Sequence, residues 1–294
     1  MGKIKYYLQL LRPANILTAI SDVLAGVALS TASSDAVGIG ETDILWLCMA
    51  TIGLYGGGIV FNDVFDAAID RFERPERPIP SGKVSVRQAA LFGSLFFVFG
   101  LLAACTVNIA AGMIASFIVC AALLYNKWAK HHRLFGPLVM GLCRGANLLL
   151  GIAIASHNLL AMGYISLVPI VYIAAITLIS SGEVHGGRKS SAMIATGAYT
   201  LVIAAIGLFA YIHHSFAYTL SCLVVLVIVI YPPLFRAMLD ADAGNVGKAV
   251  KAGIIGLIVV NAAWAMASSA FVLTGIILLL LPLSICIARF FAVT

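Results

Sequence analysis

Charged side chains are scarce in this sequence. Asp, Glu, Lys and Arg make up 10% of its 294 residues, 62% of the residues are hydrophobic, and the mean hydropathy is +1.06. These values exclude a soluble globular domain of this length and predict an all-α, polytopic bundle of membrane-spanning helices. A polar linker long enough to separate two domains is also absent, so we expect residues 1–294 to form a single domain.

Several common site motifs are missing as well. The sequence has no Ser-His-Asp arrangement, no HExxH pattern and no P-loop, so it lacks the usual signs of triad hydrolases, zinc proteases and P-loop nucleotidases. The six cysteines are scattered through apolar stretches without a CxxC pair, and we expect small buried side chains, neither disulfides nor metal ligands. The first residues lack a short apolar stretch with a cleavage site, so we expect no removable signal peptide.

What the sequence does have is a series of long apolar stretches. Most of them approach the ~20 residues that a helix needs to cross a bilayer. A short basic segment from Lys3 to Arg12 precedes them, ends at Pro13 and predicts an interfacial helix. Only Ser268 and Ser269 separate the last two stretches, but one helix cannot place ~40 apolar residues across a ~30 Å core. The ten predicted spans are Ala14–Ser30, Ile44–Phe61, Ala89–Ala104, Ile109–Tyr125, Leu134–Ile154, Leu159–Ile179, Met193–Ile212, Phe216–Leu234, Ala252–Ala267 and Ala270–Phe291.

Basic residues are distributed unevenly among the loops between these spans. Alternate loops hold Lys and Arg, the intervening loops hold none, and the first of the latter carries Asp35, Glu41 and Asp43. By the positive-inside rule, the N-terminus and the loop after Asp70 lie in the cytoplasm. This sorting explains the net charge of +6, so we expect an integral membrane protein, of the inner or plasma membrane if bacterial, without a nucleic-acid partner. The sorted residues include Lys3, Lys5, Arg12, Arg71 to Arg87, Lys127, Lys130, Arg133, Arg188, Lys189, Arg236, Lys248, Lys251 and Arg289.

An acidic stripe follows the second predicted span. At ~100° per residue, four polar side chains fall on one face of a helix, at roughly 0°, 40°, 80° and 100°: Asn62, Asp66, Asp70 and Asp63. Clustered carboxylates repel one another unless protons or cations neutralise them. Oxygen ligands of this kind suit Mg²⁺, which often shares its ligand shell with substrate phosphates. The arginines that follow, up to Arg77, would contact the same phosphates. The alternative is an acidic helix end that its basic loop neutralises.

Two further spans end in unusual residues on the same side. The fourth ends in Tyr125-Asn126-Lys127-Trp128. The segment after the sixth surrounds three glycines with a carboxylate, an imidazole and two cations, namely Glu183, His185, Arg188 and Lys189. Glycines let backbone N–H groups approach an anion closely. This pattern predicts an anion-binding loop, and the alternative is a flexible loop with ordinary positive charge.

Two ionisable residues lie inside predicted spans, Asp22 in the first and Arg144 in the fifth. Such groups are costly in the membrane and usually face a cavity or each other. Each lies about eight to ten residues from the cytoplasmic end of its span, so the two are candidates for a structural ion pair. Otherwise, Arg144 would help to hold a diphosphate, and Asp22 would orient a cation or accept a proton.

At these positions the sequence resembles a known family. The pattern Asn62-Asp63-x-x-Asp66-x-x-x-Asp70, followed by Arg77-Pro78-Ile79-Pro80-Ser81-Gly82, is similar to the first aspartate-rich motif of the UbiA superfamily of intramembrane prenyltransferases. The start Leu11-Arg12-Pro13-Ala14-Asn15, with Gly26, resembles the family's N-terminal pattern, and Tyr125-Asn126-Lys127 resembles its Tyr-x-Lys. The resemblance covers nearly the whole chain. Within the superfamily, the phrase Ser181-Gly182-Glu183-Val184-His185-Gly186-Gly187 is similar to the EboC-type branch.

The resemblance implies a helix bundle around a central cavity that opens laterally to lipid. Nine helices are usual, so the tenth predicted span would be an extra C-terminal helix away from the site. Members bind an isoprenyl diphosphate through Mg²⁺, ionise it to an allylic cation and transfer the prenyl group to an acceptor. Carried over to this sequence, Mg²⁺–diphosphate would be bound by Asn62, Asp63, Asp66 and Asp70, with Tyr125, Arg77, Lys127, Arg188 and Lys189 as its neighbours.

One motif departs from the family pattern. The usual second motif has two aspartates spaced Asp-x-x-x-Asp, whereas here Glu183 is the only carboxylate, followed by His185 and Arg188. Three outcomes remain open: Glu183 holds a second Mg²⁺ with waters, Arg188 and Lys189 replace the metal's charge, or the activity is altered or lost. The departure suggests an acceptor unlike the usual quinone precursors, and a polyol or cyclitol hydroxyl is our hypothesis.

A general base is needed if the acceptor is an alcohol. The candidates, in order, are Glu183, His185 and Asp66. Apolar walls would accept the lipid tail, and the π face of an aromatic side chain would stabilise the allylic cation, with Phe61, Phe65, Tyr55 and Tyr172 as candidates. We expect farnesyl or geranylgeranyl diphosphate as the donor, while the acceptor and the oligomeric state stay open.

Two other functions fit parts of the pattern. A lipid-binding or transport protein on the same scaffold would use Asp22 and Arg144 as a substrate path, but no internal repeat of the transporter kind is present. A membrane phosphotransferase would also use carboxylates and Mg²⁺, but its glycine- and arginine-spaced motif is missing before Asp63. The sequence therefore favours a prenyltransferase.

Overall fold

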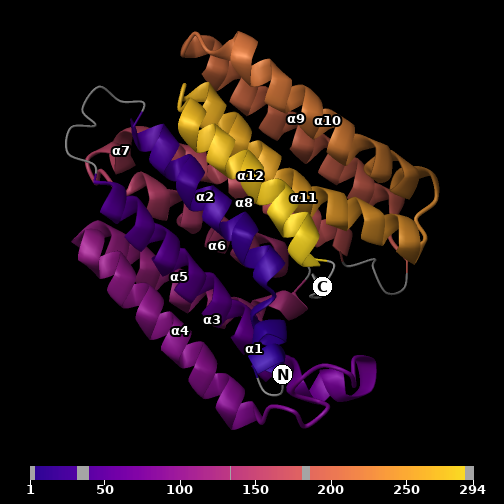
Figure 1. The fold of residues 1–294 in the computed structure, drawn as a ribbon. Coiled ribbons are helices and arrows are strands. Elements are labelled where there is room, and N and C mark those ends of the chain that lie inside the picture. Colours follow the sequence, from indigo (N-terminus) through magenta and orange to yellow (C-terminus); the bar gives the residue numbers. More distant parts are fainter. Residues whose placement is uncertain (1–3, 32–39, 133, 181–185, 289–294) are drawn as a thin grey trace.

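The computed structural model describes residues 4–31, 40–132, 134–180 and 186–288, and the described residues form helices and turns without a strand (Figure 1). The helices, with the two short 3₁₀ helices η1 and η2, are α1 Ile4–Leu11, α2 Pro13–Thr31, α3 Glu41–Glu73, α4 Val86–Val107, α5 Ile109–Lys127, η1 Ala129–His131, α6 Phe135–Ile152, α7 Asn158–Met162, η2 Gly163–Ser166, α8 Leu167–Ser180, α9 Lys189–Ile212, α10 Phe216–Leu239, α11 Ala243–Ala267 and α12 Phe271–Ala288.

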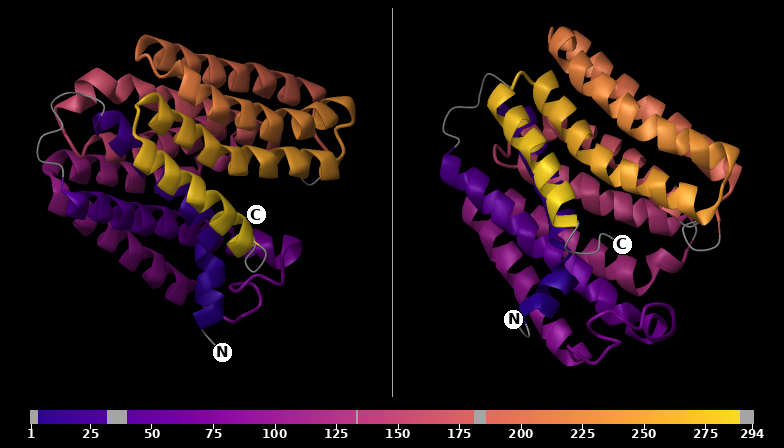
Figure 2. Two further views of the ribbon diagram at one scale, coloured as in Figure 1. Left: turned by 45° about the horizontal axis from the view of Figure 1, so that its top comes forward. Right: turned by 45° about the vertical axis from the view of Figure 1, so that its right-hand side comes forward.

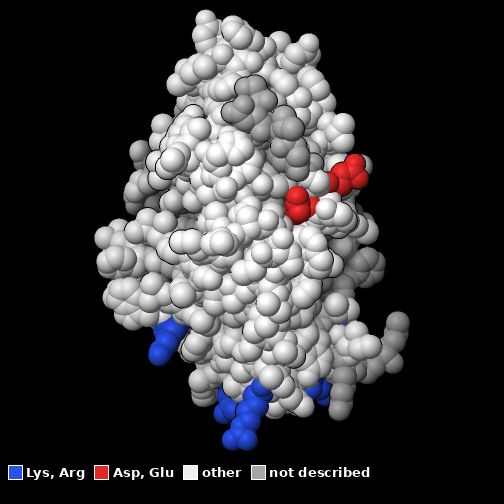
Figure 3. All heavy atoms as spheres, turned by 90° about the vertical axis from the view of Figure 1, so that its left-hand side faces the viewer, with Lys and Arg blue, Asp and Glu red and all other residues white. Residues whose placement is uncertain are grey.

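Ten helical segments of the described chain are long and apolar enough to cross a membrane. One of them, Asn158–Ser180, combines α7, η2 and α8. These segments confirm the predicted all-α membrane bundle, including the tenth span, and the protein is an integral membrane protein. On the face drawn in Figure 3, Lys and Arg gather at one end, whereas Asp and Glu lie far from that end. Which end faces the cytoplasm stays a prediction, as does the single domain.

The helix that carries the acidic stripe extends well beyond its predicted apolar span. The span ends at Phe61, but α3 continues to Glu73 and has 33 residues. At 1.5 Å per residue, a helix of this length measures ~50 Å, more than the ~30 Å of a hydrocarbon core. The polar last turns of α3 therefore project past the apolar layer, which places the stripe at the membrane boundary.

Helices α2 and α6 lie in direct backbone contact. A Cβ added at Gly26 would collide with the carbonyl oxygen of Leu148, and one added at Gly151 would collide with the carbonyl oxygen of Val23. Small residues allow this close approach of two helices in a membrane. The contact brings the middle of α2 against α6, where the buried polar groups of the site lie.

Helix α12 packs on the outside of α2 and α11, as the two views of Figure 2 show. The Ser284 hydroxyl on α12 donates a hydrogen bond of 3.1 Å to the Ala14 carbonyl oxygen at the start of α2. None of the described residues of α12 lines the central cavity, which is formed mainly by α2, α3, α5, α6, α8 and α11, with Arg12 from the joint between α1 and α2.

Candidate active site

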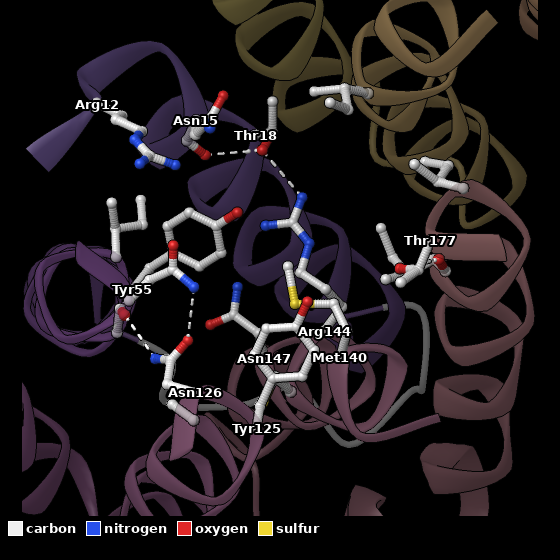
Figure 4. Close-up of a pocket in the computed structure, with 18 of the residues that line it drawn as sticks. Arg12, Asn15, Thr18, Tyr55, Tyr125, Asn126, Met140, Arg144, Asn147 and Thr177 are labelled. Carbon is white, nitrogen blue, oxygen red and sulfur yellow. Dashed lines mark hydrogen bonds between the residues drawn. The ribbon is translucent and has the colours of Figure 1, made fainter. Parts of the chain in front are cut away.

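A cavity of about 330 Å³ lies between the helices of the bundle (Figure 4), and its lining includes Asn62 and Arg74 from the polar end of α3 and the residue after it. Its charged lining residues are three arginines, Arg12, Arg74 and Arg144, and none of the described residues that line it is acidic. Most of the remaining wall is apolar, including Leu54, Ile59, Ile118, Ile173, Ile176, Ile254 and Leu257. A cavity of this kind suits a ligand with an anionic head group and an apolar tail, because fixed cations attract the first and apolar walls accept the second.

Basic side chains neutralise the acidic stripe. Arg12 Nη2 donates to Asp63 Oδ1 at 2.5 Å, and Arg77 Nη1 donates to the same oxygen at 3.3 Å. Arg77 Nη1 also donates to Asp70 Oδ2 at 2.8 Å, and the Lys130 ammonium pairs with Asp66. Arg77 comes from the basic loop after α3, as in the alternative weighed above, whereas Arg12 and Lys130 come from other segments. We call these six side chains the rim cluster.

Arg77 reaches back to α3 because the loop that carries it folds upon itself. The Ser81 amide donates to the Arg77 carbonyl at 3.0 Å, and the Val84 amide donates to the Pro78 carbonyl at 3.0 Å. Gly82 has a φ of 74°, a left-handed conformation that a glycine adopts without steric cost. Ile79 and Val84 of the same loop are buried, which holds the loop against the bundle.

Arg12 reaches the rim cluster from a joint between two helices. It lies between α1 and α2, and its φ is 44°, a conformation that is rare for a residue with a Cβ. Pro13 ends the α1 ladder, because it supplies no backbone N–H and restricts the preceding residue. Burial lowers the pKa of Arg12 from its usual value, with Asp63 opposing the shift, but an arginine stays charged near neutral pH.

A chain of amides links the wall of the cavity to its mouth. Asn62 Nδ2 donates to Asn126 Oδ1 at 3.0 Å, and Asn126 Nδ2 donates to the Gly58 carbonyl at 2.9 Å. Both side chains line the cavity, as does Tyr125 (Figure 4). Asn62 is thus held on the cavity side of α3, while the three aspartates of the stripe pair with their cations.

Deeper in the bundle, Asp22 and Arg144 form the ion pair expected from their depth. Arg144 Nε lies 3.2 Å from Asp22 Oδ2, and the two side chains are 3% and 1% exposed. Asn261 and Asn147 donate to the two carboxylate oxygens of Asp22 at 2.7 and 3.1 Å. Arg144 Nη2 donates to the Thr18 hydroxyl at 2.9 Å (Figure 4). We call these five side chains the buried network.

Comparison with known proteins identifies the family. The model of the UbiA prenyltransferase family matches residues 20–182, more than half of the chain. The chain belongs to the UbiA prenyltransferase family. This membership confirms the family and the class of enzyme, a prenyltransferase, that the motifs predicted.

Individual relatives extend the match. The chain is 29% identical to a digeranylgeranylglyceryl phosphate synthase of Methanocaldococcus jannaschii over 66% of this chain and 67% of the relative, and 32% identical to the synthase of that name from Methanosarcina mazei over 62% and 64%. A solved digeranylgeranylglyceryl phosphate synthase structure has a TM-score of 0.66 at 24% identity, covering 91% of this chain and 99% of its own. A UbiA homologue from Archaeoglobus fulgidus bound to GPP and Mg²⁺ has a TM-score of 0.57 at 13% identity, covering 90% and 98%.

The UbiA fold raises the question of whether the residues present fit a divalent ion. The stripe offers carboxylate and amide oxygens, the ligands that Mg²⁺ prefers, and Mg²⁺ needs only one or two carboxylates when phosphates and waters complete its shell. Among the described residues, no group of three His, Cys, Asp or Glu side chains gathers as a metal site. Asp66 is the most exposed of the three carboxylates, at 21%, and it has a single cationic partner. The site therefore fits a metal that arrives with its phosphates.

Several predicted UbiA site residues lie elsewhere. Lys127 is exposed and lines no cavity, while Lys130, one turn further on, pairs with Asp66. Lys189 is exposed, and Arg188 borders a second hollow of about 480 Å³ together with Lys130 and Tyr125. Lys127 and Lys189 are exposed at helix ends and line neither hollow, so their place beside a bound diphosphate stays a prediction. Glu183 and His185 lie outside the described residues.

Among the aromatic candidates for cation stabilisation, only Tyr55 lines the cavity. The Phe61 ring stacks on Phe97 with 5.4 Å between centroids, Phe65 is 40% exposed, and Tyr172 is buried with its hydroxyl on the Gly253 carbonyl. Arg12 and Asn126 both belong to motifs seen in the sequence, but the sequence did not predict where they lie in the site. Their positions depend on long-range contacts: Arg12 bonds to Asp63, 51 residues away, and Asn126 bonds to Asn62, 64 residues away.

Proposed function

We propose that the protein transfers a geranylgeranyl group from its diphosphate to a hydroxyl of a glycerol phosphate lipid. The observation that carries the proposal is the cavity itself, which Arg12 and Arg74 line beside the acidic stripe and whose remaining described wall is largely apolar. A diphosphate with an isoprenoid tail has matching charge and polarity, since arginine forms charge-assisted hydrogen bonds to phosphate oxygens.

The acceptor follows from chemistry that relatives share. Two of them are called digeranylgeranylglyceryl phosphate synthase, a name that specifies two geranylgeranyl groups on glyceryl phosphate. A geranylgeranylglyceryl phosphate with one free hydroxyl is therefore the acceptor that we propose. Like the acceptor suggested by the altered second motif, it reacts through a hydroxyl, but with one free hydroxyl it is neither a polyol nor a cyclitol, and we prefer it to both. The EboC-type placement stays a prediction.

In the proposed reaction, the bond between C1 of the prenyl chain and the diphosphate oxygen breaks, and diphosphate leaves with both electrons. The acceptor oxygen bonds to C1 and loses its proton to a base. Asp66 is the one of the three predicted bases that the structure describes, and because it is assigned to the metal below, an oxygen of the leaving diphosphate would take up the proton. Arg12 and Arg74 would stabilise the charge that develops on the leaving group, and the apolar wall would keep water from the allylic cation.

Mg²⁺ would be held at the rim by Asp66 and the Asn62 amide oxygen, with Asp63 and Asp70 holding the arginines that face the same phosphates. Bound there, the ion would supply positive charge to the leaving diphosphate. A UbiA homologue has been solved with GPP and Mg²⁺, which supports this choice of ion.

The test uses the full chain in detergent micelles with Mg²⁺, radiolabelled geranylgeranyl diphosphate and geranylgeranylglyceryl phosphate. We expect label in a doubly prenylated lipid, and its loss when EDTA removes the metal. Replacing both carboxylates, Asp63→Ala with Asp66→Ala, should reduce transfer more than about 100-fold. Equal transfer by the double variant would refute the site.

A matched control is available on the same protein. Lys248→Gln changes an exposed cation of α11 that lines neither hollow, and it should transfer label as fast as the unchanged protein. Diphosphate binding without transfer to any acceptor, including cyclitols and other polyols, would instead favour a lipid-binding or transport protein.

A further inference from the structure

Arg144 has a hydrogen-bond donor that the fold does not use. Its side chain is 3% exposed and its guanidinium lies over the Tyr55 ring, 5.1 Å from the centroid. Nη2 bonds to Thr18, whereas Nη1 is buried without a hydrogen-bond partner among the described residues. An unpaired N–H of a buried charged group costs free energy, and more so inside a membrane. Because Arg144 also lines the cavity, a ligand oxygen is the partner that would remove this cost.

The buried network also indicates what charge that ligand carries. Asp22 already compensates the Arg144 charge, and its two oxygens are held in place by Asn261 and Asn147. A second anion at Arg144 would lie next to the Asp22 carboxylate and be repelled by it. An uncharged oxygen would accept the Nη1 hydrogen bond without this repulsion.

Depth separates this donor from the rim cluster. Tyr55, which faces Arg144, precedes Asp63 by eight residues on α3. At 1.5 Å per residue, the two levels are ~12 Å apart along the helix. A diphosphate whose two phosphates both bind arginines of the rim cluster lies near the level of Asp63. The ligand at Arg144 is therefore a different chemical group.

We propose that Arg144 Nη1 donates a hydrogen bond to the free hydroxyl oxygen of the acceptor and so selects an alcohol at that level of the cavity. This inference rests on the proposed function, since it assigns a binding residue to its acceptor. The buried network holds the guanidinium still, with Asp22 balancing its charge and Thr18 fixing its orientation. The rim cluster binds the diphosphate, and the buried network binds the hydroxyl.

The test is a binding cycle in detergent micelles. The two probes are geranylgeranylglyceryl phosphate and its analogue in which hydrogen replaces the free hydroxyl. The two proteins are the unchanged chain and Arg144→Lys, which keeps a charge opposite Asp22 but lacks the planar fork of donors. We expect the unchanged chain to bind the hydroxyl compound about tenfold or more tightly than the deoxy analogue, and Arg144→Lys to bind both alike.

A second variant tests the same point if Arg144→Lys does not fold. Asp22→Asn combined with Arg144→Gln removes both charges together, so neither is left alone in the span. It should also lose the preference for the hydroxyl, while Lys248→Gln, an exposed residue of α11 outside the cavity, should retain it. In turnover assays, the KM for the acceptor should rise and the KM for geranylgeranyl diphosphate should stay within about twofold.

Two results would overturn the inference: a hydroxyl preference that survives in both Arg144 variants, or a rise in the diphosphate KM in place of the acceptor KM. Absence of binding of either lipid to the unchanged chain would overturn it as well. If both lipids bind with the expected preference but no prenyl group is transferred, the proposed function fails and the assignment of Arg144 to a hydroxyl stands.

Discussion

The rim cluster and the buried network are built from the same kind of ion pair, yet their surroundings differ. At the rim, the three basic side chains are 12–14% exposed, Asp66 is 21% exposed and the other two carboxylates are 5% exposed, and the cations come from three segments of the chain. In the buried network, Asp22 and Arg144 are nearly inaccessible and three neutral side chains hold them. Water and substrate phosphates can exchange with partners at the rim, whereas the buried groups have no such replacement.

The difference shows that charged residues around one cavity serve two purposes, ligand binding at the rim and stability in the buried network. Pairs that are partly exposed contribute little to stability, and their arginines and carboxylates are available to a ligand. Pairs inside a span are strongly coupled to the fold, because removing one partner leaves an uncompensated charge. Substitutions at the rim should therefore act mainly on turnover, and substitutions in the buried network mainly on stability.

The largest effect is expected for Asp22→Leu, which leaves Arg144 without its counter-charge in the span. The free energy of unfolding should fall by about 3–5 kcal/mol. Equilibrium unfolding in mixed micelles measures it, with Asp240→Leu, an exposed carboxylate between α10 and α11, as the control that should change it by less than about 0.5 kcal/mol. Similar losses of unfolding free energy for Asp22→Leu and Asp240→Leu would show that the buried network contributes no more to stability than an exposed carboxylate.

Arg12→Gln should act in the opposite way. Loss of this guanidinium from the cavity should lower kcat/KM for the diphosphate by about 10² to 10³-fold. Stability should change by only about 1 kcal/mol, since Asp63 retains Arg77 as a partner. Labelled-product assays and unfolding of the same samples test both parts, with the exposed Lys5→Gln on α1 as the matched control. If Arg12→Gln lost stability but kept its rate of prenyl transfer, Arg12 would serve the fold and not the reaction.

An intermediate effect is expected at Asn126, which joins α5 to α3 through Asn62 and the Gly58 carbonyl. Asn126→Leu should lower the free energy of unfolding by about 1–2 kcal/mol, because two buried hydrogen bonds lose their partner. Turnover should fall by about tenfold, since Asn62 is no longer held toward the cavity. A change in stability without a change in rate would show that Asn62 does not need this support.

The smallest effect concerns Lys130 and the metal. Its ammonium pairs with Asp66, so Lys130→Met should free that carboxylate. The Mg²⁺ concentration for half-maximal transfer should fall about two- to fivefold, the range that matches a partly exposed ion pair. Lys248→Met, an exposed cation of α11, should leave it unchanged. An increased Mg²⁺ requirement would mean that Lys130 supports the metal site and does not compete with it.

The order of the spans and the acidic stripe could be predicted because both are local patterns of sequence. Apolar runs located all ten helices, and the period of 3.6 residues placed the stripe on one face of α3. Helix ends were less accurate, since α3 and α11 continue through polar residues that hydropathy assigns to loops. Hydropathy measures transfer into a membrane, while a helix outside the membrane is held by its own hydrogen bonds and packing.

The partners of the stripe could not be predicted in the same way. Lys130 reaches Asp66 from a turn 64 residues later, and Arg12 reaches Asp63 across 51 residues. The Tyr-x-Lys resemblance favoured Lys127, but α5 ends there and η1 turns Lys130 inward. The pairing of Asp22 with Arg144 was an exception, because the cost of charge in a membrane leaves few partners at a given depth.

The contact between Gly26 and Gly151 sets a limit on how this sequence can change. At each glycine the obstacle to a methyl group is the backbone of the other helix, the Leu148 carbonyl in one case and the Val23 carbonyl in the other. No smaller side chain elsewhere can make room, so one substitution cannot rescue another. Both positions therefore act as a fixed spacer, and related sequences that keep an Asp22–Arg144 pair should keep both glycines together.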